Sequence, residues 1–172
     1  MYAPMTDPTT VQLLARMPAW VPVLFVLLLV LGYRQSFTRT VRPAVLAVLA
    51  AGMFSLSLYG VVAAFGASSA ALALWFACYA LTVVVATKRM SRAGMVAVGG
   101  VVRVPGSWVP LALLMGIFAV KFALGVAAGI RSPLLDDPAV VAAASASLGL
   151  LGGGFGARAL AVHGVARIAV GA

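Results

Sequence analysis

The sequence predicts an all-α polytopic membrane protein, organised as a single integral membrane domain over residues 1–172. Hydrophobic residues make up 64% of the chain and charged residues 9%, whereas soluble domains hold about 45–50% and about 25%. Several apolar runs also reach the ~20 residues that a helix needs to cross a ~30 Å hydrocarbon layer. Much of the surface must therefore face lipid, because a single soluble core of this size cannot bury so many apolar side chains.

Five transmembrane helices are expected along the chain, at residues 20–33, 44–66, 70–87, 109–130 and 139–162. Pro43, Pro110 and Pro138 stand at the starts of three of these runs, where a helix tolerates a missing N–H. The first run is expected to remain in the mature protein as a helix and not to be cleaved as a signal peptide. Its start is left open and could be as early as Val11. The stretch "GYRQSFTRTVR" that follows it has no small-residue cleavage site of the kind that ends a signal peptide.

The distribution of charge predicts how the five helices are oriented. One side of the membrane receives nine basic residues: Arg34, Arg39, Arg42, Lys88, Arg89, Arg92, Arg103, Arg158 and Arg167. The other side receives Arg16, Arg131 and all three acids, Asp7, Asp136 and Asp137. Because excess lysine and arginine marks the cytoplasmic face, the N-terminus is predicted outside and the C-terminus in the cytoplasm. The net charge of +9 then indicates topology and contact with anionic lipid headgroups, without a nucleic-acid partner.

A short cytoplasmic β-hairpin is predicted between the third and fourth helices. Residues 95–98 and 101–104 are rich in β-branched side chains and flank Gly99-Gly100. A two-residue hairpin turn needs positive φ at both central positions, which glycine supplies. Since an isolated hairpin is marginally stable, this one is expected to lean on the helices or on the membrane surface.

Small residues recur at every fourth position of the last predicted helix. They are Ser145, Gly149, Gly153, Ala157 and Ala161. Such a stripe lets another helix approach closely, and close packing is what associates helices in lipid. Packing within the monomer is favoured. A homodimer seam, and a helix broken at "GGGFG" that exposes backbone groups, are the alternatives.

Lys121 is the residue most relevant to function, because it lies near the centre of an apolar run. It follows Pro110 by ~16 Å of helix, and inserting such a lysine costs roughly 2.5–3.5 kcal/mol. No predicted helix holds an acid, so the ammonium is expected to point into the bundle toward hydroxyls, with helix carbonyls as further acceptors. The predicted ligand-binding residues are Lys121, Ser55, Tyr59, Tyr79, Thr82, Ser145 and Ser147, and Ser57 is a further hydroxyl at this level.

Three interpretations of Lys121 remain open. It is a hydrogen-bonded packing residue without a ligand, the positive element of a cavity, or an amine that forms a Schiff base. The third is least favoured, because five helices without an acidic counter-ion argue against a retinal-type site. The predicted function is binding or transport of a small anionic or carbonyl-bearing ligand in an intramembrane cavity around Lys121. The alternative is a non-catalytic accessory or scaffold subunit of a membrane complex.

Other chemistry is not indicated by the sequence. Cys78 is the only cysteine and His163 the only histidine, so no metal site and no disulfide within the chain is expected. No catalytic residue is assigned, an enzyme is not favoured, and no cofactor is identified.

Two segments resemble known families. They are "PAWVPVLFVLLLVLGYRQSFTRTVRP" and "VRVPGSWVPLALLMGIFAVKFALGV", in which the similarity is carried by Trp20, Gly32, Arg34, Gln35, Arg39, Val41, residues 105–108 and Lys121. The pattern resembles a family of small bacterial inner-membrane proteins of unknown function and, more distantly, the CcdC-type membrane proteins. The resemblance implies a five-helix protein of the bacterial inner membrane, and it does not indicate an activity. The CcdC-like relation would imply a neighbourhood of cytochrome biogenesis, but the chain lacks a paired-cysteine motif.

Overall fold

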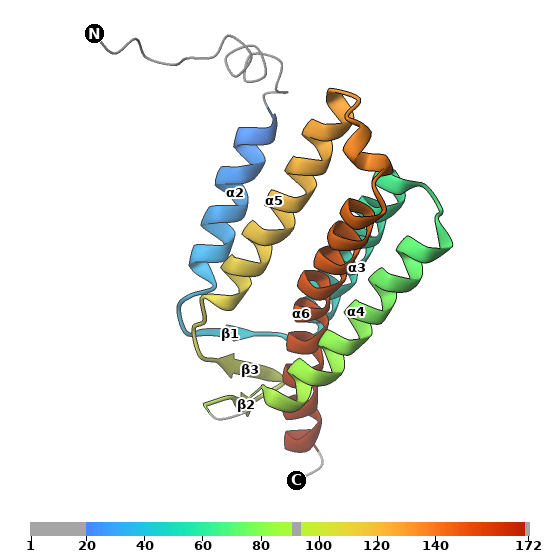
Figure 1. The fold of residues 1–172 in the computed structure, drawn as a ribbon. Helices are drawn as coiled ribbons and strands as arrows, with labels where there is room; N and C mark the ends of the chain where they lie inside the picture. The colour runs from blue at the N-terminus through green and yellow to red at the C-terminus, as the bar shows by residue number, and fades with distance from the viewer. Residues whose placement is uncertain (1–19, 91–93, 171–172) are drawn as a thin grey trace, which may run out of the picture.

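A computed structural model describes residues 20–90 and 94–170 of the chain (Figure 1). The elements in chain order are α2 (Trp20–Arg34), β1 (Arg39–Val41), α3 (Pro43–Phe65), α4 (Ser69–Arg89), β2 (Val96–Val98), β3 (Val101–Val104), α5 (Val109–Gly129), the 3-10 helix η1 (Pro133–Asp136) and α6 (Pro138–Val170). Each predicted helix is present. The bounds of the first four differ from the prediction by at most two residues.

Local signals explain where the helices begin and end. The hydroxyl of Ser68 accepts a hydrogen bond from the Ala71 N–H, and a carboxylate oxygen of Asp137 accepts one from the Ala139 N–H at 2.7 Å. Both bonds satisfy N–H groups that a first helical turn leaves free. At the other end of a helix, α3 stops at Gly66, whose φ of 67° suits glycine.

Of the five helices in the described residues, α3 to α6 are long and apolar enough to cross a membrane. The fifth, α2, has 15 described residues, which is ~22 Å of helix and short of the ~30 Å hydrocarbon layer. The earlier start considered for this run lies outside the described residues. A fifth crossing therefore stays a prediction.

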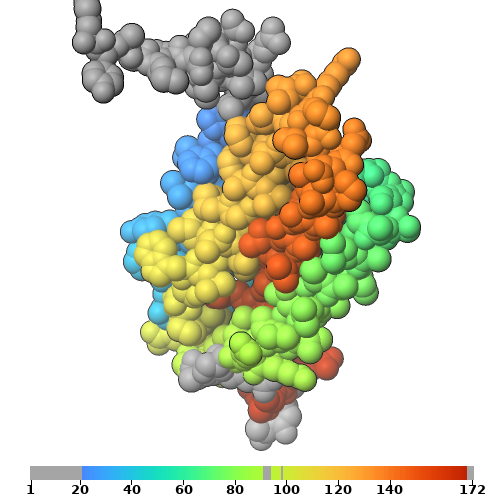
Figure 2. All heavy atoms as spheres, viewed as in Figure 1, coloured from blue at the N-terminus to red at the C-terminus, as the bar shows by residue number. Residues whose placement is uncertain are grey.

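Helix α6 occupies the centre of the bundle and contacts α3, α4 and α5. It runs parallel to α4, since Gly149 faces Trp75 and Gly156 faces Val83. It runs antiparallel to α5, where Gly154 faces Leu113 and Leu151 faces Gly116. Helix α2 packs mainly on α5. Figure 2 shows α5 and α6 side by side on one face of the molecule, with α2 and α4 at its two flanks.

The last helix departs from its prediction in length and in continuity. It has 33 residues and runs from Pro138 to Val170, whereas the sequence suggested an end at Val162. The added turns have a function in packing, because Val165 and Ala166 pack against the buried cluster that Val162 forms with Val102 and Val104 of the sheet. The helix also continues unbroken through "GGGFG", so the alternative of a broken helix is wrong.

A three-stranded antiparallel sheet closes one end of the bundle, in the order β1-β3-β2. The predicted hairpin forms β2 and β3, and its turn has φ of 57° at Gly99 and 80° at Gly100. The third strand was not predicted: β1 pairs with β3, with Arg39 opposite Val104. Three residues are too short a run to show a strand pattern. We call this end of the bundle the sheet end and the opposite one the η1 end (Figure 1).

The small-residue stripe of α6 lies against α4 of the same chain. A Cβ added at Gly149 would overlap the backbone oxygen of Trp75, and one added at Gly153 would lie 2.7 Å from the backbone oxygen of Tyr79. Ala157 is fully buried. The two helix backbones therefore approach as closely as glycine allows, in the way that lipid-embedded helices associate.

Candidate functional site

Lys121 lies at the edge of the buried face of α5. Ile117 and Leu124, one turn to either side of it, are 3% and 8% exposed and belong to the core, while Lys121 is half-buried. The residue is ~18 Å from the start of α5 and ~12 Å from its end. Its side chain therefore cannot carry the charge to either end of the helix and must find its partners at this depth.

Helix α3 supplies those partners. The Lys121 ammonium donates a hydrogen bond of 3.0 Å to the backbone oxygen of Leu56 and lies 5.5 Å from the centre of the Tyr59 ring. It also packs against Gly60, where an added Cβ would lie 3.1 Å from Nζ and 3.2 Å from Cε. We call Lys121, Leu56, Tyr59 and Gly60 the Lys121 site.

The arrangement solves part of the electrostatic problem of a lysine in an apolar layer. A carbonyl of a helix has a second lone pair beyond its helical hydrogen bond, and a tyrosine ring attracts a cation at this distance. An ammonium has three donors, and one hydrogen bond to a described residue accounts for one of them. The Lys121 site can therefore still donate to an acceptor that reaches it.

Among the described residues, the Lys121 ammonium makes no hydrogen bond to any of the predicted hydroxyls. The acceptor is a carbonyl of α3, and Tyr59 contacts the ammonium through its ring. The expectation that the ammonium points toward hydroxyls is thus corrected, and the helix carbonyl named as a further acceptor takes their place. A carbonyl is the acceptor because Gly60 has no side chain, which lets the lysine side chain lie directly on the backbone of α3.

The remaining predicted residues are distributed over the bundle. Ser55 is exposed, Ser147 is half-buried, and Ser145 is fully buried with no described partner for its hydroxyl. Thr82 donates to the Cys78 oxygen of its own helix at 2.9 Å. Tyr79 packs edge-on against Phe54, with ring centres 5.0 Å apart.

A buried hydrogen-bond network beside the Lys121 site was missed as a network by sequence reasoning. The Ser57 hydroxyl donates to the Leu148 oxygen at 2.8 Å and accepts from the indole N–H of Trp75 at 2.9 Å. Ser57 is fully buried, and Trp75 is 2% exposed. These two bonds join α3, α4 and α6. The sequence signal was a serine and a tryptophan inside apolar runs, but nothing in it paired them.

An open pocket of the described structure lies elsewhere. It has a volume of about 530 Å³ and is formed at the η1 end by the α3–α4 turn and the segment before α6, lined by Ala64, Phe65, Ser68, Arg131, Ser132, Leu135, Asp136 and Val141. No residue of the Lys121 site lines it. Within residues 20–90 and 94–170, no group of three or more His, Cys, Asp or Glu side chains could hold a metal ion.

Comparison with protein families matches residues 4–170 to one model, described as "Family of unknown function (DUF6622)". This agrees with the first resemblance in its assignment to a family without known activity. Neither the CcdC-like relation nor a bacterial origin receives support. No curated protein and no solved structure matches the chain significantly.

Proposed function

We propose a function for this chain, which belongs to the DUF6622 family of unknown function, from the geometry of its own residues. The protein binds a small anionic or carbonyl-bearing ligand at the Lys121 site, inside the membrane. The observation that carries the proposal is a half-buried ammonium, far from both ends of an apolar helix, with a single hydrogen bond to a described acceptor. Ionisable groups at such depth mark functional sites by default.

The exposure of the surrounding residues favours approach of the ligand from the side. Tyr59 is 67% exposed and Leu56 45% exposed, so the Lys121 site opens on the outer surface of the bundle between α3 and α5. In a bilayer that surface faces lipid. An amphiphile that carries a carboxylate or an ester carbonyl fits this opening, because its chain would remain in lipid while its oxygen accepts from the ammonium. Binding is supported in this way, whereas transport would be a further step.

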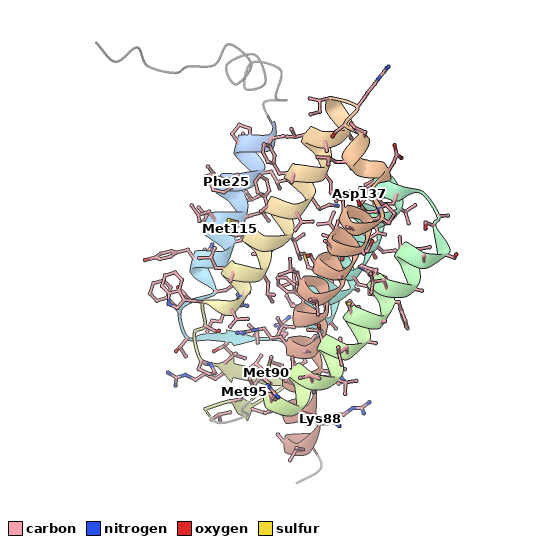
Figure 3. All side chains as sticks on the ribbon, in the orientation of Figure 1. Phe25, Lys88, Met90, Met95, Met115 and Asp137 are labelled. Carbon is pink, nitrogen blue, oxygen red and sulfur yellow. The ribbon has the colours of Figure 1, made fainter. Side chains whose placement is uncertain are left out.

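We further propose five crossings, with the sheet end in the cytoplasm of a bacterium and the N-terminus outside, across the inner membrane. The support is the separation of charge: Arg42, Lys88 and Arg103 are exposed near the sheet, and Asp136 and Asp137 are exposed at the η1 end. Figure 3 labels Lys88 and Asp137 at these two ends. Lysine and arginine accumulate on the cytoplasmic side of membrane proteins.

The proposal is tested with a long-chain carboxylate as probe and the alcohol of the same chain length as its control. We expect the purified protein in mild detergent to prefer the carboxylate. Lys121→Met should remove that preference, a loss of about tenfold or more for a charge-assisted hydrogen bond. The variant should fold and be as stable as the parent or more so, because it removes a charge from an apolar layer. Native mass spectrometry measures the bound probe and the oligomeric state together.

Two glycines of α3 provide a matched pair of variants. Gly60→Ala places a methyl group against the lysine Nζ and should weaken carboxylate binding, whereas Gly52 has no atom within 4 Å of an added Cβ and Gly52→Ala should bind normally. If Lys121→Met binds the carboxylate as the parent does, the ligand-binding proposal is overturned. The alternative of an accessory or scaffold subunit in a membrane complex would then remain.

A further inference from the structure

Two arginines converge between the sheet and α6, away from the Lys121 site. Arg39 lies opposite Val104 in the β1–β3 pair, so both side chains are on the same face of the sheet. Val104 packs against Val162 of α6, and Arg158 precedes Val162 by one helical turn. The positive charge of Arg39 acts on that of Arg158. The two guanidinium groups are therefore neighbours at the helix–sheet junction.

These two charges have no described counter-ion. Arg158 is 9% exposed, and the Nε atoms of both arginines are buried without a hydrogen-bond partner among the described residues. The one described partner is Gln35, whose side-chain oxygen accepts from Arg39 Nη2 at 3.0 Å. The acids in residues 20–90 and 94–170 are Asp136 and Asp137, at the opposite end of the bundle (Figure 3 labels Asp137).

The two buried guanidinium groups do not become neutral by losing a proton. Burial lowers the pKa of Arg39 from its ordinary value, which means that the charged form is destabilised. A guanidinium nevertheless stays protonated in proteins. Buried charges of one sign are costly unless an opposite charge accompanies them, so the junction calls for an anion from outside the described residues.

We propose that Arg39 and Arg158 form a binding site for a phosphate group. Two guanidinium forks present parallel N–H donors that match phosphate oxygens. Arg158 lies ~30 Å along α6 from Pro138, which equals the thickness of the ~30 Å hydrocarbon layer. The site is therefore at headgroup depth if α6 crosses a bilayer from the η1 end. The phosphate belongs either to an anionic phospholipid or to free inorganic phosphate.

The experiment uses the full chain in mild detergent and three probes. The probes are phosphatidylglycerol, the diacylglycerol with the same acyl chains, and inorganic phosphate. Binding is measured by native mass spectrometry and by the shift in the thermal unfolding midpoint. Phosphatidylglycerol should bind more tightly than diacylglycerol if the lipid is the source, and inorganic phosphate alone should stabilise the protein if free phosphate is.

Arginine variants show whether the bound phosphate depends on this site. Arg39→Gln and Arg158→Gln should each weaken binding about tenfold or more, since each removes charge-assisted hydrogen bonds. Arg103→Gln is the matched control, because Arg103 is exposed on the middle strand of the same sheet and pairs with Thr40 and Val96. It should bind as the parent does.

Arg158→Lys replaces Arg158→Gln in the experiment if the latter does not fold. It keeps the positive charge but loses the paired N–H donors of the guanidinium group. It should bind phosphate more weakly than the parent while Arg103→Gln does not. The proposal is overturned if neither phosphatidylglycerol nor inorganic phosphate stabilises the parent protein. It is equally overturned if the Arg39 and Arg158 variants bind with the parent's affinity.

Discussion

At the residue scale, buried polar side chains join the helices of this bundle through their hydrogen bonds. Ser57 is the clearest case, because its one hydroxyl accepts from Trp75 and donates to the Leu148 oxygen in a fully buried position. Lipid between helices offers no substitute for such partners. A short polar side chain thereby determines how α3, α4 and α6 meet, although apolar contacts make up most of the area.

We predict that Ser57→Ala destabilises the protein by about 1–3 kcal/mol, since it leaves the Trp75 N–H without its acceptor. Trp75→Phe removes the donor, so the double variant should lose less than the sum of the two single variants. The free energy of unfolding, from denaturant titration in detergent micelles, measures this coupling. Ser55→Ala on the exposed face of α3 is the control and should change stability by less than about 0.5 kcal/mol. Strict additivity would show that the bond contributes nothing.

At the scale of elements, α6 is both a membrane-length helix and a support for the sheet. Its first turns lie among α3, α4 and α5, and its last turns cover Val102 and Val104. The small residues that let α4 approach are therefore used inside the chain. The homodimer suggested by the same stripe stays a prediction, and α4 already occupies the surface on which it was based.

Gly149→Ala is predicted to destabilise the α4–α6 pair. The added methyl group would overlap the backbone oxygen of Trp75, and backbone can give way only if α4 moves. Overpacking of this kind costs about 1–3 kcal/mol. Gly125→Ala in α5 is the matched control, because no atom lies within 4 Å of its added Cβ; it should be neutral or stabilising, since alanine favours helix by about 1 kcal/mol. Equal stability of the two variants, measured by thermal unfolding in detergent, would contradict the close approach.

The molecule as a whole has two chemically different ends. The sheet end carries exposed basic residues, such as Arg42, Lys88 and Arg103, and the η1 end carries Asp136 and Asp137. Between them the exposed side chains are largely apolar, among them Val23, Val48, Phe76 and Leu81. A surface of this kind suits a bilayer, with lipid around the middle and water or headgroups at both ends.

The proposed orientation predicts which end a membrane-impermeant maleimide labels. With Cys78 replaced by alanine, Asp136→Cys at the η1 end should react in intact cells. Thr40→Cys, exposed on β1, should react only after the membrane is permeabilised. Both reactions are read as a mass increase of the purified protein. The reverse pattern would place the sheet end outside and overturn the orientation.

Hydropathy and turn chemistry were sufficient to predict five helices and the Gly99-Gly100 hairpin, because a lipid-embedded helix satisfies its own backbone and leaves its mark in composition alone. Lys121 stood out for the same reason: it interrupts an apolar run. Only the tertiary structure placed its ammonium on Leu56 and Gly60, joined β1 to β3, and brought Arg39 beside Arg158. When a helix is apolar on every side, its pattern of apolar and polar residues does not show which face meets which neighbour. Partners across helices depend on the rotation and crossing of each helix, which the three-dimensional packing decides.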